Sequence, residues 1–243
     1  MGSGDFGQTS GDPASGLGSE EDLMEDPQDE ATTRKGKGRK EKAPATAKPL
    51  TEARIRNIAE HYVGQRESSA QMLRQVLERR LMRRLRTLDP DAGAEERQAV
   101  LPLIEAEIER LQAAGVIKDG RYAEMKARSA LSSGRGSRRI LRDLGQKGVA
   151  GPAAQEALLG AAREVAGVFD EGAEPSDILR AAEVEAAEVF ARKRRLGPHR
   201  AGPLSEDWSE RSKALRREAA AMARAGFGVD TIRRVLDRVP EED

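Results

Sequence analysis

The chain has 243 residues, of which 35% are charged, 3% are aromatic and none is cysteine. This composition excludes disulfides, thiolate metal sites and a cysteine nucleophile, and it argues against a large β-rich core. No apolar run approaches the length of a membrane span, and the N-terminus lacks the apolar core of a signal peptide. We therefore expect an all-α protein of the cytoplasm, with small cores rich in Leu and Ala.

The first 49 residues differ in composition from the rest. Residues 1–33 carry nine acidic and no basic side chains, residues 34–42 are rich in Lys and Arg, and residues 43–49 are rich in Ala and Pro. Such segments bury too little apolar surface to fold, so we expect a disordered tail, first acidic and then basic. Seven basic and ten acidic residues precede Leu50, which leaves 35 basic against 32 acidic residues in the remainder. Binding of an anionic partner would thus depend on local basic clusters.

Residues 50–117 predict a first unit of three helices. Thr51 is the expected N-cap of the first helix, and Ser68 or Ser69 of the second. Asp89-Pro90 is expected to stop the second helix, because proline disrupts a helix interior. Apolar residues at helical spacing predict the third helix over residues 94–113.

Residues 118–172 predict a second unit of the same kind. Asp119 is expected to cap its first helix, and Gly134-Arg135-Gly136 to break the chain before a second helix. Pro152 sits where a first helical turn accepts proline, and it introduces a third helix over residues 153–168.

Residues 173–243 predict a third unit. Ser176 or Asp177 is expected to cap a helix that runs to Arg195, and a loop follows over residues 196–203. Two further helices are expected near residues 205–225 and over residues 229–239.

An internal repeat supports this division. The pattern of two glycines followed by Ile and Leu recurs without a gap at Gly134, Gly136, Ile140 and Leu144 and at Gly226, Gly228, Ile232 and Leu236. A looser copy has serines in place of glycines, at Ser68, Ser69, Leu73 and Leu77. Tandem units of this size bury core against their neighbours, which predicts an elongated, curved array of three-helix repeats.

The order of these motifs resembles the bacterial RecX regulators of the RecA recombinase. The similarity covers roughly residues 50 to 239, and its parts are residues 58–77, 111–124, 134–149 and 223–236. The chain departs from the family at Lys118, where an acidic residue is frequent, and in long insertions after Leu77 and Arg195. These departures affect the partner-contact residues more than the fold.

The resemblance implies a function. It implies a non-catalytic, three-repeat helical protein that binds the RecA nucleoprotein filament and mainly inhibits it. Filament assembly, ATP hydrolysis and strand exchange would be restrained, and so would recombinational DNA repair and the SOS response. Binding in the filament groove and capping of a growing end are both compatible with such a protein.

The residues themselves offer little chemistry. His61 and His199 are the only histidines and lack metal-ligand partners at typical spacing. Ser68, Ser69 and Ser137 stand where helix caps are needed, which favours capping over nucleophilic catalysis. Gly134-Arg135-Gly136 lacks the following Lys-Ser/Thr of a phosphate-binding loop. We expect no catalytic residue, no metal and no cofactor, and hence no enzyme.

Three basic clusters are the candidate partner-binding residues. They are Arg135, Arg138, Arg139 and Arg142; Arg79, Arg80, Arg83 and Arg84; and Arg192, Lys193, Arg194 and Arg195. Each can also be a solvated helix face paired with nearby Glu side chains. The first cluster lies opposite Ile140, Leu141 and Leu144 on its helix and has only Asp143 as an acidic neighbour. Tyr122, Phe227 and Trp208 are expected to pack in small helical cores rather than to bind a partner.

An alternative function is a DNA- or RNA-binding module, because an Arg-rich helix in a three-helix unit suits helix-turn-helix docking. With so few aromatic residues, contact with single- or double-stranded DNA would be made mainly to phosphates and would be sensitive to salt. We expect a monomer that binds no membrane and whose main partner is the RecA filament.

Overall fold

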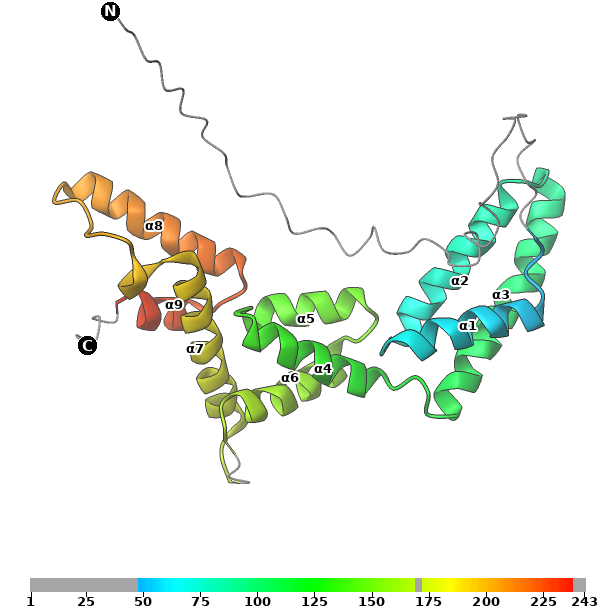
Figure 1. The fold of residues 1–243 in the computed structure, drawn as a ribbon, viewed down its shortest axis with the longest axis horizontal. Helices are drawn as coiled ribbons and strands as arrows, with labels where there is room; N and C mark the ends of the chain where they lie inside the picture. Colours follow the sequence, from blue (N-terminus) through cyan, green and yellow to red (C-terminus); the bar gives the residue numbers. More distant parts are fainter. Residues whose placement is uncertain (1–47, 169–171, 238–243) are drawn as a thin grey trace, which may run out of the picture. The chain divides into compact units, whose positions relative to one another are not determined.

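The computed structural model describes residues 48–168 and 172–237 (Figure 1). Over these residues the chain forms nine α-helices and one 3₁₀ helix, and no strand. The all-α prediction is confirmed. The tail predicted over residues 1–49 lies almost wholly outside the described residues, as does the end of the last predicted helix beyond residue 237. None of the helices in the described ranges is long and apolar enough to cross a membrane.

The first three helices are α1 (Glu52–Gln65), α2 (Ala70–Leu85) and α3 (Pro90–Ala113). The predicted caps Thr51 and Ser69 are confirmed: their hydroxyls accept the backbone N–H groups of Arg54 and Met72 at 3.4 and 3.2 Å. α2 ends at Leu85, before Asp89-Pro90 as predicted, but Asp89-Pro90 also begins α3, whose predicted start is residue 94. Asp89 caps α3 by accepting the N–H of Ala92 at 3.0 Å, and Pro90 is the first helical residue, where its missing N–H costs nothing.

These three helices enclose one hydrophobic core. α1 packs against α2 and α3, and α2 packs against α3. The core is rich in branched aliphatic residues, among which Leu73, Leu77 and Ile104 are wholly buried.

The next helices are α4 (Asp119–Ser132), α5 (Ser137–Gln146) and α6 (Gly151–Val165). Two predicted caps are wrong here. Asp119 is the first residue of α4, and its Oδ1 accepts the N–H of Ala70 at 2.8 Å, so it caps α2 instead of its own helix. Gly136, not Ser137, occupies the N-cap position of α5 and makes no side-chain cap. The position predicted for Pro152, in the first turn of a helix, is confirmed.

The last elements are α7 (Pro175–Arg194), the 3₁₀ helix η2 (Gly197–His199), α8 (Trp208–Arg224) and α9 (Val229–Leu236). The cap predicted at Ser176 or Asp177 is wrong, because α7 begins at Pro175 with Glu174 as its N-cap. Asp207 caps α8 by accepting the N–H of Glu210 at 2.8 Å.

A second core joins α4 to α9. α4 and α6 both pack against α7, and α7 packs against α9. Small Ala residues line much of this core, together with Tyr122, Ile140, Leu144 and Phe227. The helices follow one another in threes, yet the last six share this core. The boundary near residue 172 is therefore a proposal about repeats, which need not coincide with separate cores.

The two glycine motifs found in the sequence lie against each other. The N–H of Gly136 donates to the carbonyl oxygen of Ala225 at 3.0 Å, and the N–H of Arg138 to that of Gly226 at 3.3 Å. A Cβ atom on Gly136 would lie 2.3 Å from the carbonyl carbon of Gly226, which leaves room for no side chain. Gly226 also has φ of +97°, a value that L-residues with side chains rarely adopt. The repeated motif is thus a backbone contact between the α4–α5 and α8–α9 turns.

The start of α2 contacts the second core through polar groups. The Ser69 hydroxyl donates to the carbonyl oxygen of Lys147 at 2.6 Å, beside the bond from Ala70 to Asp119. Gly148, with φ of +86°, lies against Gln71, and a Cβ atom there would be 2.4 Å from the Gln71 Cβ. We call these contacts the α2 junction.

Candidate partner-binding surface

Helix α5 presents the first predicted basic cluster to solvent. Ile140 and Leu144 are buried on one side of the helix, while Arg135 just before it and Arg138, Arg139 and Arg142 along it are all exposed. The amphipathic pattern of this short helix therefore separates a core face from a cationic face, as the sequence predicts.

Asp143 pairs with two of these four arginines. Its carboxylate oxygens lie 3.0 Å from Nε of Arg139 and 3.3 Å from Nη1 of Arg135. Exposed pairs of this kind contribute at most about 1 kcal/mol, so an anionic group of a partner could displace Asp143 from them at little cost in free energy. Within residues 48–168 and 172–237, Arg138 and Arg142 have no side-chain partner. Of the four arginines of this cluster, they are the most available for a ligand.

The end of α7 carries another of the predicted basic clusters, Arg192 to Arg195, all exposed. Cations at a helix C-terminus interact favourably with the helix dipole. Lys193 Nζ donates to the carbonyl oxygen of Ser133 at 3.1 Å, and the guanidinium of Arg194 lies 6.0 Å from the centre of the Phe190 ring. Arg195 ends the helix in the left-handed conformation, with φ of 53°.

The fold brings the start of the α5 cluster next to the end of α7. A Cβ atom on Gly134 would lie 2.9 Å from the backbone nitrogen of Phe190, so the α4–α5 turn rests on the last turns of α7. The contact between Lys193 and Ser133 joins the same two segments. We call the combined set the α5–α7 basic surface; it consists of Arg135, Arg138, Arg139, Arg142, Arg192, Lys193, Arg194 and Arg195.

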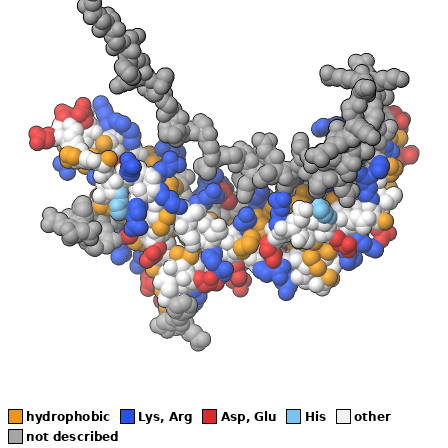
Figure 2. Space-filling model, in the orientation of Figure 1, with side chains coloured by type: hydrophobic (Ala, Val, Ile, Leu, Met, Phe, Trp, Pro, Cys, Tyr) orange, Lys and Arg blue, Asp and Glu red, His pale blue; other side chains and the backbone are white. Residues whose placement is uncertain are grey.

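The remaining cluster lies on the second half of α2, which packs against α3. Arg79 and Arg83 are exposed, whereas Arg80 is half-buried and Arg84 forms an ion pair with Glu96 of α3 at 3.2 Å. At least one member therefore holds helices together. On the face shown in Figure 2, Lys and Arg side chains lie over both α1–α3 and α7–α9 with carboxylates among them.

The two histidines lie in different helices. His61 is exposed, with its Nε2 3.0 Å from Nε2 of Gln65, and His199 lies in η2. Among the described residues, no group of three or more His, Asp or Glu side chains could hold a metal ion.

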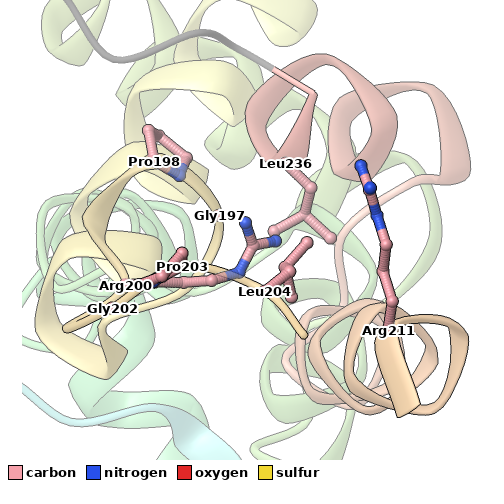
Figure 3. A pocket seen from close by; sticks show the side chains of 8 residues that line it. All are labelled: Gly197, Pro198, Arg200, Gly202, Pro203, Leu204, Arg211 and Leu236. Carbon is pink, nitrogen blue, oxygen red and sulfur yellow. The ribbon is translucent and has the colours of Figure 1, made fainter. Parts of the chain in front are cut away.

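A pocket beside η2 is occupied by the protein's own charges. It is lined by η2, by residues that follow η2, including Pro203 and Leu204, and by Leu236 of α9. The Arg200 side chain extends into it (Figure 3). Arg200 forms two 2.6 Å hydrogen bonds with Glu218 of α8, and the N–H of Gly197 donates to the same carboxylate at 3.1 Å. These bonds raise the pKa of Arg200 above its ordinary value. The pair therefore anchors η2 to α8, and the Arg200 charge is already neutralised by Glu218.

The three aromatic residues behave differently. Tyr122 and Phe227 are 1% exposed, and the Phe227 ring meets that of Phe190 edge-on with centroids 5.6 Å apart, which confirms their predicted packing. The packing predicted for Trp208 is wrong, because this side chain is 77% exposed. It is the first residue of α8, a helix in which Met222, near the other end, is the one fully buried residue. The sequence shows an aromatic at a helix start, but not how much of the helix is covered.

The chain is similar to known proteins along most of its length. A family model described as RecX, second three-helix domain, matches residues 119–158. The regulatory protein RecX of Myxococcus xanthus (strain DK1622) is 32% identical over 202 residues, which are 83% of this chain and 94% of that protein. The regulatory protein RecX of Halorhodospira halophila (strain DSM 244 / SL1) is 30% identical over 189 residues, covering 78% of this chain and 90% of that protein.

Two solved structures are also similar. One is a crystal structure of a regulatory protein RecX, with a TM-score of 0.49 and 16% identity, covering 77% of this chain and 72% of that one. The other is RecX from Lactobacillus salivarius, with a TM-score of 0.47 and 18% identity, covering 76% and 96%.

Proposed function

The chain belongs to the RecX family of non-catalytic regulatory proteins, and from this premise we propose that it binds the RecA nucleoprotein filament and mainly inhibits it. Bound to the filament, it would restrain assembly, ATP hydrolysis and strand exchange, and so moderate DNA repair and the SOS response. The observation that supports a specific binding site is the contact of the α4–α5 turn with the end of α7, which places the start of one basic cluster beside the other.

The composition of this surface favours an anionic partner that it meets at several points. Eight cations lie on two segments in contact, and one carboxylate, Asp143, pairs with two of them. Complementary charge speeds association and selects the partner more than it adds affinity. We assign Arg138 and Arg142 the main contacts, since they need not break an existing ion pair. Arg135 and Arg139 would add to binding after exchanging Asp143 for the partner's anion.

The first test is DNA-dependent ATP hydrolysis by the cognate RecA, titrated with the full chain. We expect suppression at substoichiometric amounts of the chain, and no ATP hydrolysis by the chain alone. Unchanged RecA activity over the whole titration would contradict the proposal.

A pair of variants tests the surface itself. Arg138→Ala/Arg142→Ala should weaken suppression at least tenfold, because each lost phosphate or carboxylate contact reduces both encounter rate and affinity. Its melting temperature should stay within a few degrees of the wild type, as the side chains are exposed. The control Arg97→Ala/Arg180→Ala removes the same charge from exposed positions on α3 and on the first half of α7. Equal suppression by the two double variants would rule out a specific role for α5.

One observation supports the alternative of direct nucleic-acid binding. Arg138 and Arg142 are separated by one helical turn, a rise of about 6 Å, and both side chains are available to phosphates. Anisotropy of labelled DNA in a salt series separates the two functions. Tight binding to naked DNA without RecA, together with an unchanged RecA ATPase, would favour the nucleic-acid-binding module.

A further inference from the structure

Trp208 is the only tryptophan of the chain, and at 77% it is the most exposed large apolar side chain in the part of the chain that the structure describes. A tryptophan normally buries 150–250 Å² of surface, so leaving it in water forgoes a large gain in free energy. Tryptophan is also among the residues most enriched at the energetic centres of protein interfaces. Its exposure at the start of α8 is thus a feature that the fold of this chain does not use.

The backbone that carries Trp208 is held in place. Asp207 accepts the N–H of Glu210 at 2.8 Å, and its own N–H donates to Oγ of Ser205 at 3.2 Å. The Ser205 hydroxyl donates in turn to the Glu210 carboxylate at 2.9 Å. A side chain presented by a capped helix start loses less conformational freedom on binding than one presented by a loose loop.

Most of the charges next to Trp208 are acidic. Within residues 206–211 the exposed charged side chains are Glu206, Asp207, Glu210 and Arg211, three carboxylates against one guanidinium. Three carboxylates repel phosphates, so they disfavour stacking of Trp208 on a nucleic-acid base. The same carboxylates would attract the Lys and Arg side chains of a protein. This region therefore differs in sign from the α5–α7 basic surface and cannot bind the same chemical group.

We propose that Trp208 is the anchor of a second docking site. Its side chain inserts into an apolar pocket on the protein surface of the RecA filament, and Lys or Arg side chains surround that pocket. This inference rests on the proposed function, since it takes the same partner. Glu206 and Glu210 attract the Lys or Arg side chains around the pocket, and the indole of Trp208 makes the buried apolar contact. The α5–α7 basic surface and Trp208 then bind separate regions of the filament, one acidic and one basic.

The direct test replaces Trp208 of the full chain with 5-hydroxytryptophan, which is excited selectively beside the ordinary tryptophans of a partner. Because the chain has one tryptophan, the label reports on this position alone. Addition of RecA assembled on single-stranded DNA should shift the emission to shorter wavelength and protect the label from acrylamide quenching. A label that stays fully quenchable while the chain is bound would overturn the inference and leave the proposed function intact.

Affinity measurements make the test independent of the label. Trp208→Ala should weaken binding to the RecA filament by about 30-fold, the loss typical of an interface anchor. Trp208→Phe should recover most of it, and Glu206→Lys/Glu210→Lys should weaken binding through the rim. The matched control Val229→Ala removes another exposed apolar side chain, 55% exposed at the start of α9, and should bind as the wild type does.

Three outcomes would count against the inference. Wild-type affinity of Trp208→Ala would refute the anchor. Protection of the label that rises with the chain's own concentration, without RecA, would assign the site to a second copy of the chain. Absence of any binding to the RecA filament, in both the wild type and the control, would refute the proposed function together with this site.

Discussion

The core of α1–α3 and the core of α4–α9 are stabilised in different ways, although both consist only of helices. Each of α1, α2 and α3 begins with a side-chain cap, supplied by Thr51, Ser69 and Asp89. Among α4–α9, only α8 has such a cap, and the other helices begin at residues that make none. Their ends are positioned by neighbouring helices, as the contact between Gly136 and Gly226 shows. Local signals define the helices of one core, and tertiary contacts define those of the other.

The largest expected effect is on the cores themselves. Leu73→Ala and Ile140→Ala change equivalent positions of the repeat, 0% and 2% exposed, and each should cost about 2–5 kcal/mol of stability. If the two cores unfold separately, hydrogen exchange in Leu73→Ala should accelerate in α1–α3 and not in α4–α9, with the reverse in Ile140→Ala. Acceleration throughout the chain in both variants would show one cooperative unit instead.

The glycine contact comes next. Gly136→Ala places a methyl group 2.3 Å from the backbone of Gly226, and backbone cannot move aside as a flexible side chain can. We expect a loss of about 1–3 kcal/mol in denaturant unfolding, confined to α4–α9. Gly145→Ala is the matched control in the same helix, because a Cβ atom there meets nothing within 4 Å. It should be neutral or stabilising by up to about 1 kcal/mol.

The α2 junction, where the two cores meet through polar groups, predicts a smaller effect. Ser69→Ala removes both the cap of Met72 and the bond to Lys147, and should cost about 0.5–2 kcal/mol. Asp119→Ala should cost about 1 kcal/mol, because the N–H of Ala70 loses its acceptor. Faster amide exchange at Ala70 and Met72 is the expected signature. Unchanged exchange at Ala70 in Asp119→Ala would mean that this bond does not form in solution.

The smallest expected effect is electrostatic and belongs to the first core. Hydrogen bonds from Arg74 of α2 lower the pKa of Glu105 of α3. A carboxyl with a lowered pKa stabilises the fold above its unfolded value of about 4.3, and this contribution is lost as the pH falls through the folded value. Because both side chains are partly exposed to solvent, which screens the charges, the pair is worth less than about 1 kcal/mol. The free energy of unfolding should therefore fall slightly less between pH 7 and pH 3 in Glu105→Gln than in the wild type.

Much of the fold could be predicted from local patterns. Apolar spacing located the helices, and Thr51, Ser69 and Pro152 marked helix starts because capping and first-turn proline depend on nearby residues alone. The predictions failed where the partner of a residue is distant. Asp119 has the pattern of a local cap, yet it caps α2, 49 residues earlier. Trp208 has the pattern of a core aromatic, yet its side chain is 77% exposed.

The sequence by itself determined the helical class, the repeated glycine motif and the cationic face of α5, since each follows from spacing along the chain. Only the tertiary structure decided that the two copies of the motif contact each other and that the α4–α5 turn, just before Arg135, lies against the end of α7. It also decided that Trp208 is exposed. These features depend on which helices pack together, and that choice is made by the summed burial of many side chains rather than by any single stretch of sequence.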